Sequence, residues 1–255
     1  MESHTRITTP FGRTSTAGEI MAGLDLSGKR AIVAGGASGI GTETARALAA
    51  GGAAVTITAR DTRAGQAELS ARTGNREVTS APLELTCRSS VAEFVSGWSG
   101  PLHILVCNAG IMAPQQLHRT REGWELQFAA NHLGHFNLAT RLHDALAAAG
   151  GARIVSVSSN AHRHCAVIFD DINFERRPYD PWLAYGQSKT ANALFAVEAA
   201  SRWASDGVVA NALMPGGIRT GLQRYPLQDI TPEIQAIFDS YPRRPLSRAR
   251  LPPCC

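Results

Sequence analysis

The sequence predicts a single α/β domain built on a parallel sheet that carries helices on both faces. Between Arg30 and Leu213, short runs that are apolar throughout alternate with helical stretches. Apolar strands separated by helices are typical of parallel sheets buried on both faces. A length of 255 residues suits one large domain better than two. In such doubly wound sheets, ligands bind beyond the carboxyl ends of the strands.

The first half of the domain contains three predicted strands. Arg30–Ala34 (RAIVA) is rich in β-branched residues and ends at glycines, which allow a tight turn into the expected helix Ile40–Ala50. Val55–Ala59 (VTITA) is a second β-branched run, and Val78–Leu85 is a weaker third one. The helices after these two strands are expected at Thr62–Arg72 and Ser89–Trp98.

The second half repeats the alternation with longer helices. We expect strands at Leu102–Val106 (LHILV), Arg153–Val157 (RIVSV) and Val208–Leu213. Two long helices, Glu122–Ala148 and Trp182–Ala204, lie between them. Neither an internal repeat nor a linker divides this block, so we expect one domain over residues 24–224.

Both ends of the chain differ from this domain. Residues 1–23 lack hydrophobic periodicity and are expected to form an arm. Residues 225–255 are rich in Pro and Arg, with one helix expected at Ile230–Ser240 and no seventh strand. We expect this tail to be poorly ordered. The sixth strand would then be an apolar edge, which lowers stability.

Composition and charge exclude several classes of protein. Hydrophobic residues make up 44% of the chain and charged residues 18%, as in ordinary soluble proteins. Without a long apolar stretch or a secretory signal, we expect a cytoplasmic protein with no membrane span. The net charge of +4 is spread along the chain, so we do not expect nucleic-acid binding. The five cysteines fit neither a zinc site nor a disulfide framework, and we expect no metal.

A glycine turn follows the first strand. The segment Gly35-Gly36-Ala37-Ser38-Gly39-Ile40-Gly41 leads directly into a helix. Its glycines let the backbone approach a pyrophosphate, and the helix N-terminus offers free N–H groups to the anion. The spacing G-x-x-x-G-x-G differs from the commoner G-x-G-x-x-G fingerprint. A tight β–α connection without a ligand is the alternative.

The end of the second strand bears on the choice of cofactor. A site for NAD usually has an acidic residue there, which accepts hydrogen bonds from the ribose 2′-hydroxyl. This strand ends in Ala59-Arg60, and Asp61 lies one residue too far along. A guanidinium suits a 2′-phosphate, so we expect NADP rather than NAD. The alternative is that Arg60 is an exposed residue at the entry to a helix.

Tyr185 and Lys189 lie four residues apart in a predicted helix, so they share a face. An ammonium beside a phenol stabilises the phenolate, which suits the phenol to proton exchange near neutral pH. The chain has only two lysines, Lys29 and Lys189, among many arginines. A Tyr-x-x-x-Lys match alone is weak evidence.

Further motifs accompany this pair in a fixed order. They are Asn108-Ala-Gly110, Asn131-His-Leu-Gly-His-Phe136, Ser156-Val-Ser-Ser159 and Pro215-Gly-Gly-Ile-Arg-Thr220. Together with the glycine turn, they resemble the short-chain dehydrogenase/reductase superfamily, which has a Rossmann-type fold, over residues 25–224. The segments Tyr185–Asn192 and Asn131–Phe136 are most similar to the branch that contains retinol dehydrogenases and WW-domain oxidoreductases.

The resemblance implies roles for individual residues. Tyr185 would be the general acid/base, and Lys189 would assist it and hold the nicotinamide ribose. Ser159 would bind the substrate oxygen, with Ser158 as the alternative, and Asn131 would order a water near Lys189. The resemblance places Gly35, Gly39 and Gly41 at the pyrophosphate, Asn108 on the adenosine side, and Pro215, Gly216 and Thr220 at the nicotinamide. The other expected cofactor-binding residues are Ser38, Ile40, Arg60, Glu84, Leu85, Ala109 and Gly110.

The sequence also departs from the family pattern. Ala34 stands where a threonine is usual, and Glu84 stands where the acidic residue is usually Asp. Ser159 and Tyr185 are 26 positions apart, so the segment from His162 to Trp182 is expected to form a loop beside the substrate. We expect the C-terminus to lack the family's usual covering helix and seventh strand, as a truncated or frame-shifted end would.

Three functions follow from these observations. The first is an NADP-dependent oxidoreductase that acts on an alcohol, aldehyde or ketone. The second is a protein that binds NADP(H) with little or no turnover, because of the unusual C-terminus. The third is a non-enzymatic interaction protein on the same fold, which would have no need of Asn131, Ser159, Tyr185 and Lys189. If the protein forms a homodimer, we expect helices 122–148 and 182–204 to form its interface.

Overall fold

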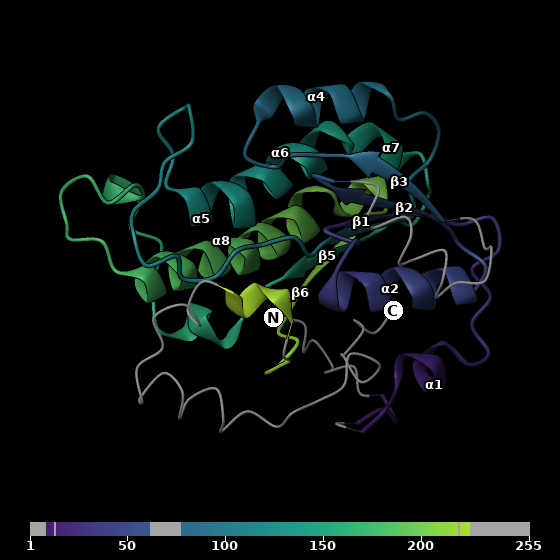
Figure 1. Ribbon diagram of the computed structural model, residues 1–255. Helices are drawn as coiled ribbons and strands as arrows, with labels where there is room; N and C mark the ends of the chain where they lie inside the picture. The colour runs from purple at the N-terminus through teal and green to yellow at the C-terminus, as the bar shows by residue number, and fades with distance from the viewer. Residues whose placement is uncertain (1–8, 13, 62–77, 219, 225–255) are drawn as a thin grey trace, which may run out of the picture.

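The computed structural model describes residues 9–12, 14–61, 78–218 and 220–224, and the statements below concern these residues. They form one sheet of six parallel strands in the order β3-β2-β1-β4-β5-β6 (Figure 1). The predicted doubly wound α/β fold is therefore confirmed. The strands are β1 (Arg30–Ala34), β2 (Ala54–Ala59), β3 (Val78–Pro82), β4 (Ile104–Cys107), β5 (Arg153–Val157) and β6 (Val209–Leu213).

The strand order reverses direction between β1 and β4, which lie side by side at the centre of the sheet. Ala34 at the end of β1 is in register with Thr58 of β2 and with Cys107 of β4. Reversal points of this kind open a crevice beyond the carboxyl ends of the strands. The fold therefore places the binding crevice at the end of β1, where the glycine turn begins.

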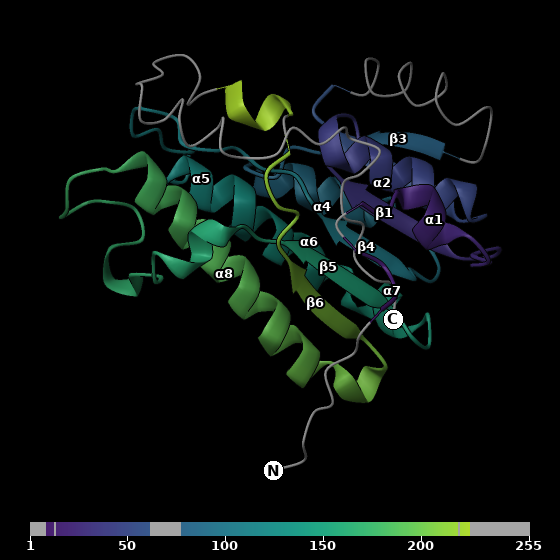
Figure 2. The same ribbon diagram turned by 90° about the horizontal axis from the view of Figure 1, so that it is seen from below.

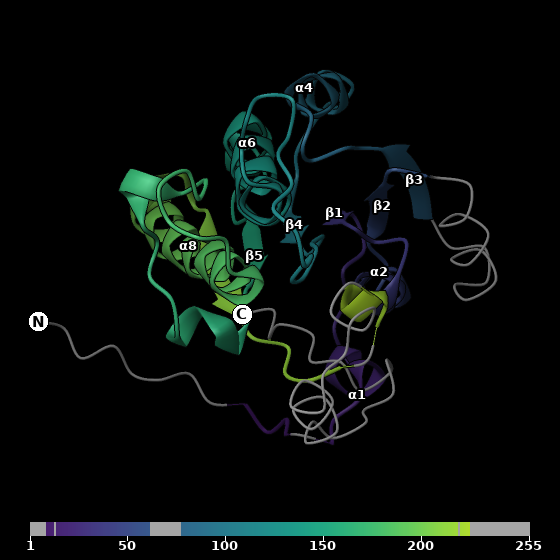
Figure 3. The same ribbon diagram turned by 60° about the vertical axis from the view of Figure 1, so that its left-hand side comes forward.

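Successive residues of each central strand pack on opposite faces of the sheet. Ile32 and Ala34 contribute to the larger core with α4 (Arg88–Ser96), α6 (Gly134–Arg141), α7 (His143–Ala147) and α8 (Pro181–Arg202). Ala31 and Val33 pack on the other face with α2 (Gly39–Ala50). Figure 3 shows these two layers on either side of the sheet. This burial on both faces explains why the strands are apolar throughout.

A short helix, α1 (Ala17–Met21), lies within the segment expected to form an arm. Thr16 and Glu19 form a capping box, in which each side chain bonds the backbone N–H of the other residue. Ala17 and Met21 are buried against Ala47 of α2, and Figure 2 shows the two helices side by side. Five residues are too few for hydrophobic periodicity to reveal a helix.

The prediction of one long helix over Glu122–Ala148 is wrong. The segment consists of α5 (Leu126–Phe128), a π-helical turn η1 (Ala129–Leu133), α6 and α7. The helix begins late because the carboxylate of Glu125 accepts hydrogen bonds from the N–H groups of Gln127 and Phe128, which makes Glu125 the N-cap. At Leu142 the backbone leaves the helical region, which separates α6 from α7.

The other boundaries differ from the predictions by a few residues. β3 ends at Pro82 rather than Leu85, because Glu84 turns to accept hydrogen bonds from the backbone N–H and hydroxyl of Thr86. α8 begins at Pro181, where Asp180 caps the N–H groups of Trp182 and Leu183. Short 3₁₀ turns lie at η2 (Asn160–Arg163), η3 (Phe169–Asp171), η4 (Ala204–Asp206) and η5 (Gly221–Arg224).

Several predictions fall on residues that the structure does not describe. The helix expected at Thr62–Arg72, the tail 225–255 and its helix at Ile230–Ser240 all lie outside the described ranges. Within those ranges, β6 is the last strand of the sheet, and no helix is long and apolar enough to cross a membrane. Cys87, Cys107 and Cys165 carry free thiols, and the described residues contain no cluster of potential metal ligands.

Candidate active site

A cavity of about 760 Å³ lies at the carboxyl ends of the strands, over the junction of β1 and β4. Its wall contains the glycine turn, the ends of β2, β4 and β5, the second and third turns of α8 and the segment after β6. Most of the predicted site residues line it, namely Gly35, Ser38, Gly39, Ile40, Arg60, Glu84, Leu85, Asn108, Ala109, Gly110, Ser159, Tyr185, Lys189, Pro215, Gly216 and Thr220. Gly41 and Asn131 are not in the cavity wall.

The glycine turn is shaped by contacts that exclude side chains. Gly35 has φ of +73°, and a Cβ on it would come within 2.7 Å of Ala109 Cα. A Cβ on Gly41 would overlap the carbonyl oxygen of Gly35. Gly41 therefore lets α2 close against the turn rather than facing the cavity. The amide of Asn108 holds the turn from β4, because it donates hydrogen bonds to the carbonyl oxygens of Ala34 and Gly35.

The N-terminus of α2 faces the cavity from this turn. Ser38 is the N-cap, and its side chain makes no capping hydrogen bond. The first N–H groups of a helix that lack a side-chain cap are suited to an anion. Thr42, which the sequence analysis did not single out, donates its buried hydroxyl to the carbonyl oxygen of Gly36. The Thr42 hydroxyl of α2 thus stabilises the glycine turn by a hydrogen bond. Ala34, at the start of the turn, has no hydroxyl that could do so.

Arg60 and Glu84 form the rim of the cavity beyond β2. Arg60 Nε lies 3.9 Å from Glu84 Oε2, and the two side chains are 70% and 38% exposed. An exposed pair at this distance is weak, so it is easily exchanged for another anion. The other carboxylate oxygen of Glu84 is held by Thr86 at 2.7 and 3.0 Å. The carboxylate of Glu84 is therefore held in place beside the long side chain of Arg60, and both residues line the cavity.

Tyr185 and Lys189 lie together on the buried face of α8. Their side chains are almost fully buried, and Lys189 Nζ is 5.7 Å from the centre of the Tyr185 ring. The ammonium donates a hydrogen bond to the carbonyl oxygen of Val157 at 3.0 Å. Burial lowers the pKa of Lys189 to about 8. Tyr185 packs against Met112 and Ala113, which follow β4.

The two serines after β5 have different surroundings. The hydroxyl of Ser158 is buried and donates to the carbonyl oxygen of Lys189 at 2.7 Å. Ser159 is half-buried, and its Oγ caps η2 by accepting a long hydrogen bond of 3.3 Å from Ala161 N. Both serines line the cavity, but the hydroxyl hydrogen of Ser158 is already used within the protein. The geometry therefore favours Ser159 as the hydroxyl that serves a ligand.

Asn131 lies behind the cavity wall, in the π-helical turn. Its Oδ1 accepts a hydrogen bond from Ile111 N, and its amide nitrogen donates to Ile111 O and Ser188 Oγ. A Cβ on Gly110 would lie 2.9 Å from Asn131 Oδ1 and 3.6 Å from Lys189 Nζ. Because Gly110 has no side chain, Asn131 and Lys189 can both approach its backbone closely.

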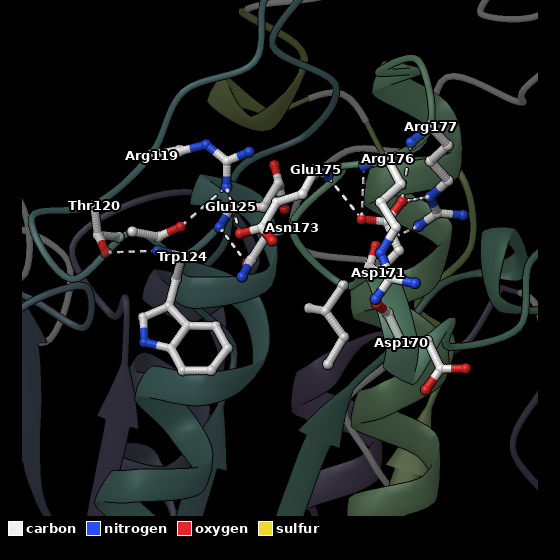
Figure 4. A network of polar contacts seen from close by, with 12 residues as sticks. Arg119, Thr120, Trp124, Glu125, Asp170, Asp171, Asn173, Glu175, Arg176 and Arg177 are labelled. Carbon is white, nitrogen blue, oxygen red and sulfur yellow. Dashed lines mark hydrogen bonds and ion pairs between the residues drawn. The ribbon is translucent and has the colours of Figure 1, made fainter.

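The segment from His162 to Trp182 does not border the cavity as expected. The cavity wall passes from Asn160 to Tyr185 without any residue of this segment. The loop is folded on itself, because Asp171 accepts hydrogen bonds from the N–H groups of Glu175, Arg176 and Arg177 (Figure 4).

Gln187 of α8 holds the same loop against the helix. This residue lies between Tyr185 and Lys189 in the chain, and its side chain is fully buried. Gln187 accepts hydrogen bonds from Ile168 N and from Arg177 Nη2, and it donates one to Ile172 O. These internal bonds hold the loop against α8 and away from the cavity.

A buried polar residue before η1, Gln127, also escaped sequence reasoning. Gln127 accepts a hydrogen bond from Ala113 N and donates to Tyr179 Oη and Pro181 O. It thereby holds Ala113 at a φ of +48°, which is unusual for a residue other than glycine. The sequence contained no signal for this role, because polar residues near a helix start are usually exposed.

The fold and the cavity together define a class of protein. A glycine turn at the first β–α connection and a buried Tyr–Lys pair in the same crevice are the parts of a dinucleotide-dependent oxidoreductase. A family model described as short chain dehydrogenase matches residues 29–230. The chain therefore belongs to the short-chain dehydrogenase/reductase family.

Curated relatives support both the family and the predicted branch. The chain is 54% identical over 205 residues to a probable oxidoreductase of Streptomyces antibioticus, covering 79% of this chain and 68% of that protein. It is 39% identical over 209 residues to human retinol dehydrogenase 12, covering 79% and 65%. It is 37% identical over 221 residues to the WW domain-containing oxidoreductase of Gallus gallus, covering 82% and 53%. The chain thus spans 53% to 68% of the length of these relatives.

Solved structures show the same fold. A putative uncharacterized protein from Mycobacterium paratuberculosis is 42% identical, with a TM-score of 0.70 over 77% of this chain and 71% of that one. An NADP active-site complex of RhlG from Pseudomonas aeruginosa is 26% identical, with a TM-score of 0.63 over 82% and 80%.

Proposed function

We propose that this protein transfers a hydride between NADP(H) and the carbon of an alcohol, aldehyde or ketone, with Tyr185 as the general acid/base. The observation that carries the proposal is that Ser159, Tyr185 and Lys189 line the same cavity as the glycine turn. A non-enzymatic scaffold has no use for a buried lysine, since burial of an ammonium opposes folding.

The residues around the cavity suit a dinucleotide. The pyrophosphate would lie at the glycine turn, against the uncapped N-terminus of α2 that begins after Ser38. Arg60 would bind the 2′-phosphate that distinguishes NADP from NAD, and the RhlG structure, which has a similar fold, is a complex with NADP. NADP(H), when bound, supplies or accepts the hydride.

The chemical roles of the side chains follow from their surroundings. In reduction, the Tyr185 hydroxyl donates its proton to the carbonyl oxygen of the substrate, and in oxidation the phenolate accepts it back. The buried ammonium of Lys189 stabilises that phenolate through its positive charge. Ser159 donates a hydrogen bond to the same substrate oxygen. Asn131 orders the surroundings of Lys189 from behind Gly110.

The substrate side of the cavity is apolar. Met112, Ala113 and Tyr185 form a small cluster, and Leu222 packs against it. Met112, Tyr185 and Leu222 of this cluster line the cavity, together with Ile111 and Val157. A wall of this kind favours an apolar carbonyl compound over a charged one. Small apolar aldehydes and ketones are therefore the first substrates to test.

The cofactor assignment gives a prediction about Arg60. We expect NADPH to bind more tightly than NADH, and Arg60→Gln to weaken NADPH binding about 10-fold with little change for NADH. Combining Ala59→Asp with Arg60→Gln should shift the preference toward NADH. The measurement is a fluorescence titration with each nucleotide.

The matched control is Arg202→Gln, because Arg202 is similarly exposed and pairs with Glu198 on α8, away from the cavity. This variant should bind NADPH like the unmodified protein. Equal affinities of the unmodified protein for NADPH and NADH would contradict the assignment of Arg60.

We also propose a homodimer through the surface of α6 and α8. Phe136, Leu194 and Val197 are exposed there, at 46%, 51% and 70%. Both helices lie on the same side of the sheet (Figure 3). Exposed apolar residues grouped on adjacent helices are typical of an interface.

The dimer proposal predicts that Val197→Arg yields a monomer, because a guanidinium would have to be buried without a partner at the centre of the interface. Light scattering after gel filtration measures the mass. The control Leu24→Arg changes a residue that is exposed to 42% and lies outside this surface, and it should remain a dimer. A monomeric unmodified protein at micromolar concentration would contradict the proposal.

A further inference from the structure

The main-chain carbonyl of Asn131 lies in an unusual stretch of helix. In η1, the N–H of Gly134 donates to the carbonyl oxygen of Ala129, five residues back rather than four. A π-helical turn of this kind changes the usual pairing of backbone groups and often occurs at functional sites. Gly134 allows the turn to lie close to the end of β3, because a Cβ there would come within 2.5 Å of Leu85.

A histidine side chain holds this carbonyl. His135 Nδ1 is 2.9 Å from Asn131 O, and the residue is only 2% exposed. A carbonyl oxygen only accepts hydrogen bonds, so Nδ1 must carry the hydrogen and Nε2 the lone pair. Burial lowers the pKa of His135 to about 4, which keeps the ring neutral at physiological pH.

The other nitrogen of His135 shows that packing does not explain the choice of residue. Nε2 is buried and has no hydrogen-bond partner among the described residues. A leucine or phenylalanine fills a buried position without leaving a polar atom unpaired, so an imidazole is a costly choice for packing alone. Unlike an apolar side chain, the imidazole donates a hydrogen bond from Nδ1 to the carbonyl oxygen of Asn131.

The side chain of Asn131 has already committed both of its amide hydrogens, to Ile111 O and Ser188 Oγ. Ser188 in turn donates to the carbonyl oxygen of Tyr185. The position of the Asn131 backbone therefore governs a short chain of hydrogen bonds that leads to the backbone of Tyr185. Any group that fixes this backbone also fixes that chain.

We propose that His135 is a positioning residue, whose Nδ1–H holds the Asn131 carbonyl in the π-helical turn and thereby places Asn131 against Gly110 and Lys189. This inference rests on the proposed function, in which Asn131 orders the surroundings of Lys189. His135 touches neither the cavity nor the substrate, so its effect is on the rate of the chemical step and not on ligand binding.

Three substitutions at one position test this role. An asparagine amide can place its nitrogen where imidazole has Nδ1, and a glutamine amide where imidazole has Nε2, whereas leucine provides neither. We expect His135→Leu to lower kcat roughly 10- to 100-fold, with KM and the Kd for NADPH changed less than about two-fold. His135→Asn should restore kcat to within about three-fold of the unmodified protein, and His135→Gln should not.

Rescue by Gln instead of Asn would overturn the proposal, because it would assign the role to Nε2. So would three variants that lose thermal stability but keep full kcat, since that result describes packing alone. Tyr185→Phe is measured in the same assay, and its loss of turnover establishes the proposed function independently of His135.

A spectroscopic measurement keeps the inference testable even if no substrate is turned over. The ¹⁵N chemical shifts of His135 distinguish the two neutral tautomers in the cofactor-free protein. We expect the Nδ1–H tautomer from pH 8 down to about pH 5. The Nε2–H tautomer, or a charged ring at neutral pH, would contradict the proposal.

Discussion

Replacement of Tyr185 by Phe is expected to lower kcat by about three orders of magnitude and to leave the Kd for NADPH within about two-fold. The substitution removes the hydroxyl that donates the proton and keeps the ring that packs against Met112 and Ala113. The fold and the nucleotide side of the cavity are therefore preserved. The measurements are steady-state kinetics with the best carbonyl substrate and a fluorescence titration with NADPH.

Tyr179→Phe is the matched control. Its hydroxyl donates to Pro114 O and accepts from Gln127 Nε2, outside the cavity wall. We expect this variant to lose about 1 kcal/mol of stability and to retain near-normal turnover. If Tyr185→Phe keeps turnover within a few-fold of the unmodified protein, Tyr185 is not the general acid/base.

Replacement of Lys189 by Met is expected to have two opposite effects. Turnover should fall by at least about 10³-fold, because the charge that stabilises the Tyr185 phenolate is lost. The cofactor-free protein should nevertheless become more stable by roughly 1–3 kcal/mol at pH 7. Lys189 is fully buried, and Met has a similar length without the cost of burying a charge. Val157 O, which loses the ammonium, still accepts a hydrogen bond from Asn192 Nδ2.

The pH dependence of stability provides the decisive readout for Lys189. Its pKa is about 8 in the folded protein, against an ordinary value of 10.5, so between these values the unfolded chain binds more protons. Stability therefore rises as the pH increases from about 8 to 10.5, and the full cost of the buried charge is present below pH 8. Lys189→Met should lack this rise. Urea unfolding without cofactor at pH 7 and pH 9.5 measures it.

Lys29→Met is the control for this experiment, because Lys29 is exposed and is the only other lysine in the chain. It should keep both the rise in stability and normal turnover. A Lys189→Met protein that is less stable than the unmodified protein at pH 7 would show that the ammonium is not costly in its site.

The sheet was predictable from the sequence because the central strands β1, β4 and β5 are buried almost along their whole length and are therefore mostly apolar. The bounds of β1 and β5 agree with the prediction residue by residue, since glycines and serines end these runs abruptly. The long helix Glu122–Ala148 was not predictable, because its interruption depends on the buried carboxylate of Glu125 and on the contact between Gly134 and Leu85. The cap at Glu125 depends on burial of its carboxylate, and Gly134 and Leu85 are far apart in the chain. A local sequence pattern reports neither burial nor distant contacts.

The sequence motifs predicted which residues line the candidate site, but they did not predict the buried hydrogen bonds that hold those residues in place. Tyr185, Lys189 and Ser159 come together in the cavity because strand ends and one helix face converge there. Gly41 and Asn131 lie behind the wall, and the loop from His162 to Trp182 is folded on itself instead of bordering the cavity. The supporting bonds of Gln127 and Gln187 join side chains to backbone groups 14 and 15 residues away, and no sequence spacing encodes them. The bond of His135 is local, to the carbonyl of Asn131 four residues earlier, but it depends on burial of the ring, which the sequence pattern does not report.

Transfer of deuterium from NADPH tests the central claim most directly. The protein is incubated with NADPH deuterated at the reactive carbon of the nicotinamide and with a panel of apolar aldehydes and ketones, and the products are analysed by mass spectrometry. We predict that at least one alcohol product carries one deuterium on its carbinol carbon, and that Tyr185→Phe abolishes its formation. Tight binding of NADPH without deuterium in any product would contradict the account and would identify a cofactor-binding protein without turnover.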